Sequence, residues 1–327
     1  MYDKKLLIIY ILEILKKETD EEHHLTQTEI MRKLDSKYGQ ECDRRSVKSN
    51  IEALVEAGYD IVCDDGYYLA ERELDDAQLR MLIDSVLFSK VIPASSAKRL
   101  LGKLSEMGSK YFKPKVSHIA VAGEVQRSDN KQVMYSVDTI NDAIGRKKKI
   151  SFFYNTYKKD MKLHLLSDEP FVVSPYQMVA KNRWYYLICC PDGKDIVYHF
   201  RIDRMANVIK LDDDIRPMKE VKGLEHGLNL PKHLAEHVYM YGGESIPIRF
   251  KIKEESLNHV VDWFGKDIKI VKDEDAMLTI RVICNRQAMY YWAIQYGLHV
   301  EVMDPPELRK EIAEAVAKMN ETYNGRI

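Results

Sequence analysis

Four cationic side chains in the middle of the chain are placed to bind an anion together. They are Arg183, His199, Arg201 and Arg204. Tyr198, Phe200 and Ile202 alternate with His199, Arg201 and Asp203, so a strand would carry an apolar face and an opposite face that is cationic and polar. Guanidinium groups bind phosphate and carboxylate through paired hydrogen bonds. The pattern therefore predicts an anion-binding surface.

Structural ion pairs are the alternative for this surface, because Arg201 and Arg204 lie close in sequence to Asp203 and to the acidic run 212–214. The turn-forming residues at 191–194 are expected to join two neighbouring strands. Short strands at regular intervals favour a small barrel. A short helix is expected at 135–146, and strands near 149–154, 163–166, 171–179, 184–190 and 196–202.

A second group of polar side chains lies near the N-terminus, on a predicted helix that starts at Asp43 and ends near residue 57. Val47, Ile51 and Leu54 recur at helical spacing and form its buried stripe. The candidate DNA-binding residues are Arg44, Arg45, Lys48, Ser49 and Asn50. A recognition helix needs such side chains at its outward N-terminal half, where base edges and phosphates lie. The alternative is an ordinary solvated helix face.

The elements around this helix favour a winged helix-turn-helix. A first helix is expected at about 4–17, and a second from Thr26 to about Tyr38, where Thr26 and Glu29 have the spacing of a capping box. A hairpin with a turn at 64–66 follows. Three helices followed by a hairpin is the order of a winged helix-turn-helix. The two aspartates at the hairpin tip would repel phosphate, so the wing is not expected to bind DNA.

The remaining patterns predict a multidomain α+β protein. Residues 75–112 are helical with a break at Pro93, and Ile119–Val121 has strand character. From 246 to 323, strands and helices alternate and predict an α+β domain. Four domains are expected: the winged helix-turn-helix at 1–72, a helical connector at 73–132, the barrel at 133–220 and the C-terminal α+β extension at 221–327.

Composition restricts the possible functions. The net charge is −1, and residues 1–70 carry 10 Lys and Arg against 15 Asp and Glu, so DNA binding must come from a local patch. The five cysteines show no paired spacing, and the chain has no long apolar run or signal peptide, so a cytoplasmic location without a membrane segment is expected. No catalytic motif, cofactor fingerprint or metal-ligand spacing is present, so no enzyme, cofactor or metal is expected.

Three segments together resemble the WYL domain of bacterial transcriptional regulators: Pro175–Val179, Arg183–Leu187 and His199–Met205. The run that names the family is Trp-Tyr-Leu, and here an extra tyrosine makes it Trp-Tyr-Tyr-Leu. The segment Trp292–Val302 resembles the C-terminal extension of the same regulators. The resemblance covers essentially the whole chain.

The resemblance implies a five-stranded Sm-like (SH3-like) barrel that senses a ligand and acts within a homodimer. The implied ligand is a nucleotide or a fragment of nucleic acid, often single-stranded DNA, in a basic pocket. Carried over by position, the ligand-binding residues are Tyr176, Arg183, His199, Arg201 and Arg204.

The expected function is a ligand-responsive, DNA-binding transcriptional regulator. Its partners would be double-stranded operator DNA, a single-stranded or nucleotide effector and a second copy of the chain. The alternative is a non-regulatory accessory protein that binds RNA or single-stranded DNA with its barrel. Sequence-specific binding of duplex DNA distinguishes the two.

Overall fold

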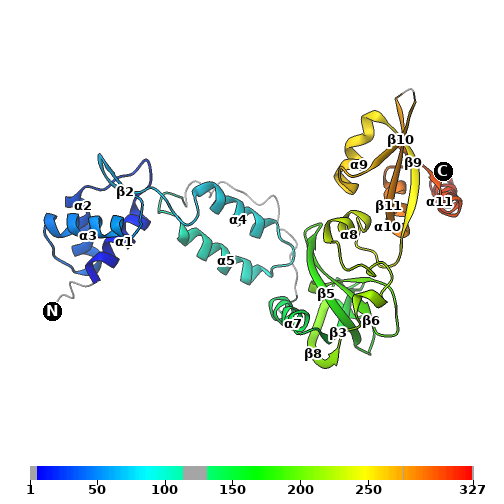
Figure 1. Ribbon diagram of the computed structural model, residues 1–327, viewed down its shortest axis with the longest axis horizontal. Coiled ribbons are helices and arrows are strands. Elements are labelled where there is room, and N and C mark those ends of the chain that lie inside the picture. The colour runs from blue at the N-terminus through cyan, green and yellow to red at the C-terminus, as the bar shows by residue number, and fades with distance from the viewer. Residues whose placement is uncertain (1–5, 113–129, 131, 275, 326–327) are drawn as a thin grey trace. The chain divides into compact units, whose positions relative to one another are not determined.

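The chain forms two compact units, Met1–Asp129 and Asn130–Ile327, each described here by itself (Figure 1). The structure is a computed structural model and describes residues 6–112, 130, 132–274 and 276–325. The strand predicted at Ile119–Val121 and the end of the predicted connector lie outside these residues. None of the helices in the described ranges combines the length and the apolar character that crossing a membrane requires.

The first unit begins with three helices and a hairpin, in the predicted order. These are α1 (Leu7–Glu18), α2 (Gln27–Tyr38), α3 (Arg44–Glu56), β1 (Ile61–Asp64) and β2 (Gly66–Leu69). Local side-chain chemistry sets the helix starts: the Thr26 hydroxyl and Glu29 form the predicted capping box, and Asp43 accepts a hydrogen bond from the Ser46 amide at 2.7 Å. Helix α2 ends at Gly39, whose φ of 61° suits glycine.

One apolar cluster holds these elements together. The predicted stripe of α3 is buried in it, and α1 and α2 supply most of the other side chains. Its buried members are Leu7, Ile11, Ile14, Leu15, Leu25, Ile30, Leu34, Val47, Ile51, Leu54 and Leu69. Since this stripe faces inward, the opposite side of α3 faces solvent.

The predicted helical connector follows as α4 (Asp76–Phe88) and α5 (Ala94–Met107), separated before Pro93 as expected. Polar contacts fasten the segments on either side of it to α1. Arg72 donates to the backbone carbonyls of Lys16 and Thr19 at 2.7 and 2.6 Å, and the Lys110 amide donates to the Lys17 carbonyl at 2.8 Å. The connector is therefore part of the same unit as the three helices.

Glu18, at the end of α1, is an ionic link within this unit. Its side chain is 8% exposed and pairs with Lys33 at 3.0 Å, with Lys110 at 2.6 Å and with Lys37. Burial raises the pKa of the Glu18 carboxyl, but hydrogen bonds from Lys110, Lys37 and Lys33 outweigh it and lower the pKa to about 2. The carboxylate therefore stabilises the fold above its ordinary pKa of 4.5, and this contribution is lost as the pH falls towards 2.

We expect Glu18→Gln to lower the free energy of unfolding by about 2–3 kcal/mol at neutral pH, because it removes the charge that the three lysines share. Urea denaturation monitored by circular dichroism would measure the loss. The difference from wild type should shrink between pH 4.5 and pH 2. Glu21→Gln, an exposed carboxyl in the next turn, is the control and should have little effect. A pH-independent difference would contradict this role of Glu18.

The second unit begins with α7 (Val133–Gly145) and a curled antiparallel sheet (Figure 1). The strands are β3 (Lys148–Tyr157), β4 (Leu163–Leu165), β5 (Phe171–Lys181), β6 (Trp184–Pro191), β7 (Tyr198–Arg201) and β8 (Met205–Asp214). The order is β4-β3-β5-β6-β7, and β8 also pairs with β3. The predicted barrel is thus a half-barrel: among the described residues β7 and β8 share no ladder, and the turn 202–204 joins them. Strand β8 was not predicted.

The inner face of this sheet forms one core and the outer face another. Side chains such as Ile150, Phe152, Leu187 and Phe200 pack inside the curl against α7. On the outer face, Ile188 packs against residues 215–240, which were not assigned to any element. This outer segment contains the turn Met218–Glu220 and helix α8 (Leu230–Glu236).

The C-terminal part is an α+β layer pair, as predicted. Its sheet has the order β10-β11-β9-β12, with β9 (Ser245–Lys253), β10 (Lys269–Glu274), β11 (Met277–Asn285) and β12 (Val300–Asp304). The helices are α9 (Leu257–Phe264), α10 (Arg286–Gln295) and α11 (Pro306–Asn324). Trp292 is fully buried at the centre of the core and packs against Phe250 and Phe264. The protein is therefore a multidomain α+β protein.

Candidate functional site

The predicted cationic strand lies at the edge of the curled sheet. Strand β7 pairs with β6, and Tyr186 lies opposite Arg201 while Ile188 lies opposite His199. The predicted alternation is confirmed, because Phe200 is buried in the inner core while His199 and Arg201 point to the outer face. The two cations share a face but have different surroundings.

Arg201 is held by an aromatic ring and a carboxylate. Its guanidinium carbon lies 3.3 Å from the centre of the Trp184 ring. Its Nε and Nη2 donate to the two carboxylate oxygens of Asp203 at 3.0 and 2.7 Å. Asp203 is buried, with 4% of its surface exposed. Arg201 thus forms the structural ion pair that the sequence left open, and its side chain is 16% exposed.

Within the described part of the chain, Arg204 has no comparable carboxylate partner. Its Nε is buried and has no hydrogen-bond acceptor among the described residues. Burial raises the pKa of the Tyr154 and Tyr186 hydroxyls, and the positive charges of Arg201 and Arg204 partly offset this rise. Both cations therefore lie near the same two tyrosine rings. Because the Asp203 carboxylate is already paired with Arg201, the guanidinium of Arg204 gives this region an excess of positive charge.

The other predicted ligand residues lie in different places. Arg183 is exposed in the turn between β5 and β6, where Asn182 and Arg183 have φ values of 50° and 71°. Tyr176 is 4% exposed, packs in the outer core, and its hydroxyl donates to the Arg216 carbonyl at 2.8 Å. Tyr176 was predicted to bind the ligand; in the structure its ring packs in the core and its hydroxyl already has a partner.

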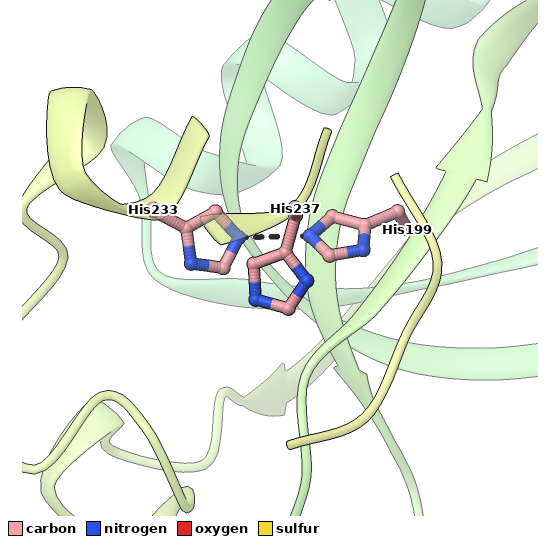
Figure 2. Close-up of side chains that lie close together, drawn as sticks. All are labelled: His199, His233 and His237. Atoms are coloured by element: carbon pink, nitrogen blue, oxygen red, sulfur yellow. Dashed lines mark hydrogen bonds between the residues drawn. The ribbon is translucent and has the colours of Figure 1, made fainter. Parts of the chain in front are cut away.

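His199 belongs to a histidine cluster that sequence reasoning missed. Its Nε2 lies 2.8 Å from Nε2 of His233, and the ligand nitrogens of His199, His233 and His237 all lie within 4.8 Å of one another. Figure 2 shows the three rings close together, with the contact between His199 and His233 as a dashed line. The i, i+4 spacing of His233 and His237 was the available signal, since it places both rings on one side of a helix.

The three imidazoles are neutral at neutral pH. Burial, reinforced by the neighbouring histidines and Lys181, lowers the pKa of His233 to about 3 and holds the pKa of His199 well below its usual value. Burial and Lys181 lower the pKa of His237 to about 4. Without a charge, His199 would contact an anion only by donating a hydrogen bond, and its place in the anion site stays a prediction.

Four of the five residues predicted for the recognition surface of α3 are exposed: Arg44, Arg45, Lys48 and Ser49. Arg44 and Asn50 also make contacts within the unit. Arg44 donates to the Thr28 hydroxyl of α2 at 3.2 Å, and the Asn50 amide donates to the Ser46 carbonyl of its own helix at 2.7 Å.

The hairpin tip differs in charge from α3. Asp64 and Asp65 are both exposed there, as the sequence predicted. Lys48 has only a long contact with Glu52, at 3.9 Å, so its ammonium group is available to a ligand. The cationic surface of the first unit that was predicted to face DNA is therefore the N-terminal half of α3.

Comparisons with known proteins identify the second unit. The WYL domain matches residues 136–209, and the WCX domain matches residues 244–319. The chain is 20% identical over 298 residues to the "Uncharacterized HTH-type transcriptional regulator YobV" of Bacillus subtilis (strain 168), which covers 85% of this chain and 89% of that relative. The predicted family resemblance is thereby confirmed, whereas the four domain boundaries stay predictions.

Two solved structures are also similar at 14% identity. One is the proteasome accessory factor B/C (PafBC) of Arthrobacter aurescens, with a TM-score of 0.30, covering 95% of this chain and 47% of that one. This chain thus spans about half of its length. The other is a CRISPR Cas-related protein, with a TM-score of 0.40, covering 99% of this chain and 92% of that one. The chain therefore contains a WYL domain and a WCX domain, and over most of its length it is similar to a transcriptional regulator.

Proposed function

We propose that this regulator binds operator DNA through its first unit and senses a phosphate-bearing ligand at its WYL domain. The observation that carries the proposal is the outward face of α3, where Arg45, Lys48 and Ser49 are exposed together. The relative of regulator type supports the same role.

The first unit fits a winged helix-turn-helix. Helices α2 and α3 pack on α1 and are joined by the short segment 39–43, which begins at the left-handed Gly39. In this motif the second helix of the pair enters the major groove with its N-terminal residues against the bases. Arg45 and Lys48 would contact phosphates and base edges, and the Ser49 hydroxyl would add a short donor and acceptor.

The proposed effector site is the outer edge of β6 and β7. The Nε of Arg204 supplies a donor that has no acceptor among the described residues, and the partly exposed side chain of Arg201 supplies a second cation. Trp184 already stacks on Arg201, so a base could extend the stack on the other side of the guanidinium. Cations beside a planar stack suit a nucleotide or single-stranded nucleic acid. Arg183, exposed in the adjacent turn, would contact a phosphate further along the strand.

We also propose a homodimer in the cytoplasm, without catalytic activity. Residues 1–70 carry 10 basic and 15 acidic side chains, so one copy would bind DNA weakly. Two linked copies on two half-sites would multiply such contacts.

An electrophoretic shift assay with the DNA upstream of the chain's own gene tests the proposal. The expected result is a shifted band that survives an excess of unrelated duplex, because base contacts add to the phosphate contacts. Equal competition by unrelated duplex would contradict operator binding.

A second candidate function is an accessory protein that binds RNA or single-stranded DNA with the WYL domain alone. The observation in its favour is the exposed acidic tip of the hairpin, Asp64 and Asp65, which repels phosphate. It predicts that single strands, and not duplex, compete for the shifted band in the same assay.

A further inference from the structure

We propose that His199, His233 and His237 form a binding site for a divalent transition metal ion, of which Zn²⁺ suits three imidazoles best. The site lies outside both matched domains except for His199, since the other two histidines fall between residues 209 and 244. It is also separate from the proposed contacts of Arg201 and Arg204 with an effector.

The distances suit a metal. Zinc binds imidazole nitrogen at about 2.0–2.1 Å in tetrahedral geometry, so ligand nitrogens lie about 3.3 Å apart. Here Nε2 of His199 and Nε2 of His233 are 2.8 Å apart, and all three ligand nitrogens lie within 4.8 Å. Rotation of the rings would bring the three nitrogens around one ion.

The surroundings direct two of the rings. The Tyr241 carbonyl accepts a hydrogen bond from Nδ1 of His199 at 3.1 Å and from Nδ1 of His237 at 3.0 Å. Both Nδ1 atoms therefore carry the proton, and both Nε2 atoms have a lone pair. In His237 this lone pair faces the Ser245 hydroxyl at 3.4 Å, and in His199 it faces His233, so a metal would replace these two contacts. Metal-binding histidines commonly donate their second ring proton to a backbone carbonyl in this way.

The backbone that carries this carbonyl is fixed from two sides. Asn182 donates to the Val238 carbonyl at 3.0 Å, and Asn285, at the start of α10, donates to the Gly242 carbonyl at 3.0 Å. These two hydrogen bonds hold the backbone of the segment between the two matched domains in place on both sides of Tyr241, whose carbonyl accepts from the histidines. Such support is what a site of defined geometry requires.

The third ring needs one proton shift. Because Nε2 of His199 accepts, Nε2 of His233 donates in the 2.8 Å contact between them. To bind a metal, His233 moves that proton to Nδ1, which changes the tautomer and leaves the charge unchanged. Lys181, whose ammonium donates to the Leu234 carbonyl, helps to keep the rings neutral but also opposes a cation, so it lowers the affinity.

A cavity leaves room for a fourth ligand. It has a volume of about 580 Å³, and His233, His237, Glu236 and Ser245 are among its lining residues. Three protein ligands with one open position is the arrangement of zinc sites that bind water or a small ligand. An occupied site would join strand β7 of the WYL domain to the segment that leads into the WCX domain.

The test uses the full chain without an affinity tag, stripped of metal by a chelator. Titration calorimetry with Zn²⁺ should show one equivalent bound with a Kd of about 1 μM or tighter. Co²⁺ should give the visible absorption bands of a tetrahedral site. A hundredfold excess of Zn²⁺ over Kd should raise the Tm by about 5 °C or more.

Variants locate the site. His237→Gln should weaken Zn²⁺ binding at least about 100-fold, since even supporting residues of metal sites contribute 10–100-fold. His226→Gln is the matched control, because this histidine lines the same cavity but is exposed and outside the cluster, and it should bind like wild type. No binding by wild type at 100 μM Zn²⁺ would overturn the proposal. So would one equivalent retained at full affinity by His237→Gln, or lost by His226→Gln. None of these measurements involves DNA, so the proposed function stands or falls separately.

Discussion

Replacing Arg45 and Lys48 together by alanine is expected to weaken binding of the upstream duplex by about 100-fold at moderate salt. Each side chain is exposed on the outward face of α3, so the change removes two cations and their base contacts without touching the core. A good base contact contributes about 1–3 kcal/mol to the binding free energy. Each lost phosphate contact reduces the slope of log affinity against log salt concentration by about one. Fluorescence anisotropy at several salt concentrations would measure both effects.

The matched control removes two cations elsewhere in the same unit. Lys98 and Arg99 are exposed on α5, far in sequence from the recognition helix, and their replacement by alanine also lowers the net charge by two. This variant should keep most of the affinity. Equal weakening by both double variants would mean that only overall charge matters, and an unaffected Arg45→Ala/Lys48→Ala protein would refute the assignment of α3.

Arg201→Ala is expected to destabilise the WYL domain by about 3–5 kcal/mol, because it leaves the Asp203 carboxylate buried without its bidentate partner. Replacing both residues, Arg201→Ala with Asp203→Ala, should cost much less, since no charge is then left unpaired. Urea denaturation of Arg201→Ala, Asp203→Ala and the double variant would give the coupling energy of the pair. Additive losses in this cycle would show that the pair does not act as a unit.

Arg204→Ala tests effector binding at the same site without a large expected effect on stability. The Nε of Arg204 has no acceptor within the described residues, so its removal should leave the free energy of unfolding nearly unchanged. Affinity for a single-stranded oligonucleotide should fall about tenfold or more, as expected for a charged hydrogen bond to phosphate. Unchanged oligonucleotide binding would place the effector elsewhere, whereas a large loss of stability would show that Arg204 is a structural residue.

Local chemistry explains which parts of the fold could be predicted. The starts of α2 and α3 follow from Thr26 and Asp43, whose side chains accept hydrogen bonds from amides three residues on. The alternation around Phe200 placed it in the core and its neighbours on the other face, as the structure shows. Signals of this kind act over a few residues and need no knowledge of the tertiary structure.

The missing parts depend on contacts between distant residues. Strand β8 ends in an acidic run and is stabilised by its ladder with β3, so its own composition is a weak signal. His199 and His233 are 34 residues apart and meet only because the segment after the sheet folds back over its outer face. The sequence left open whether Arg201 binds an anion or pairs with a carboxylate. The answer depends on the burial of Asp203 in the turn 202–204, which the sequence pattern does not show.

The central claim is that duplex DNA and the effector bind at different places and influence each other. The most direct test is the affinity of the wild-type protein for the labelled upstream duplex, measured by anisotropy with and without a saturating single-stranded oligonucleotide, beside Arg204→Ala. The account predicts a change of about 5–150-fold in wild type and little change in Arg204→Ala. An unchanged duplex affinity in wild type, or the same change in both proteins, would contradict it.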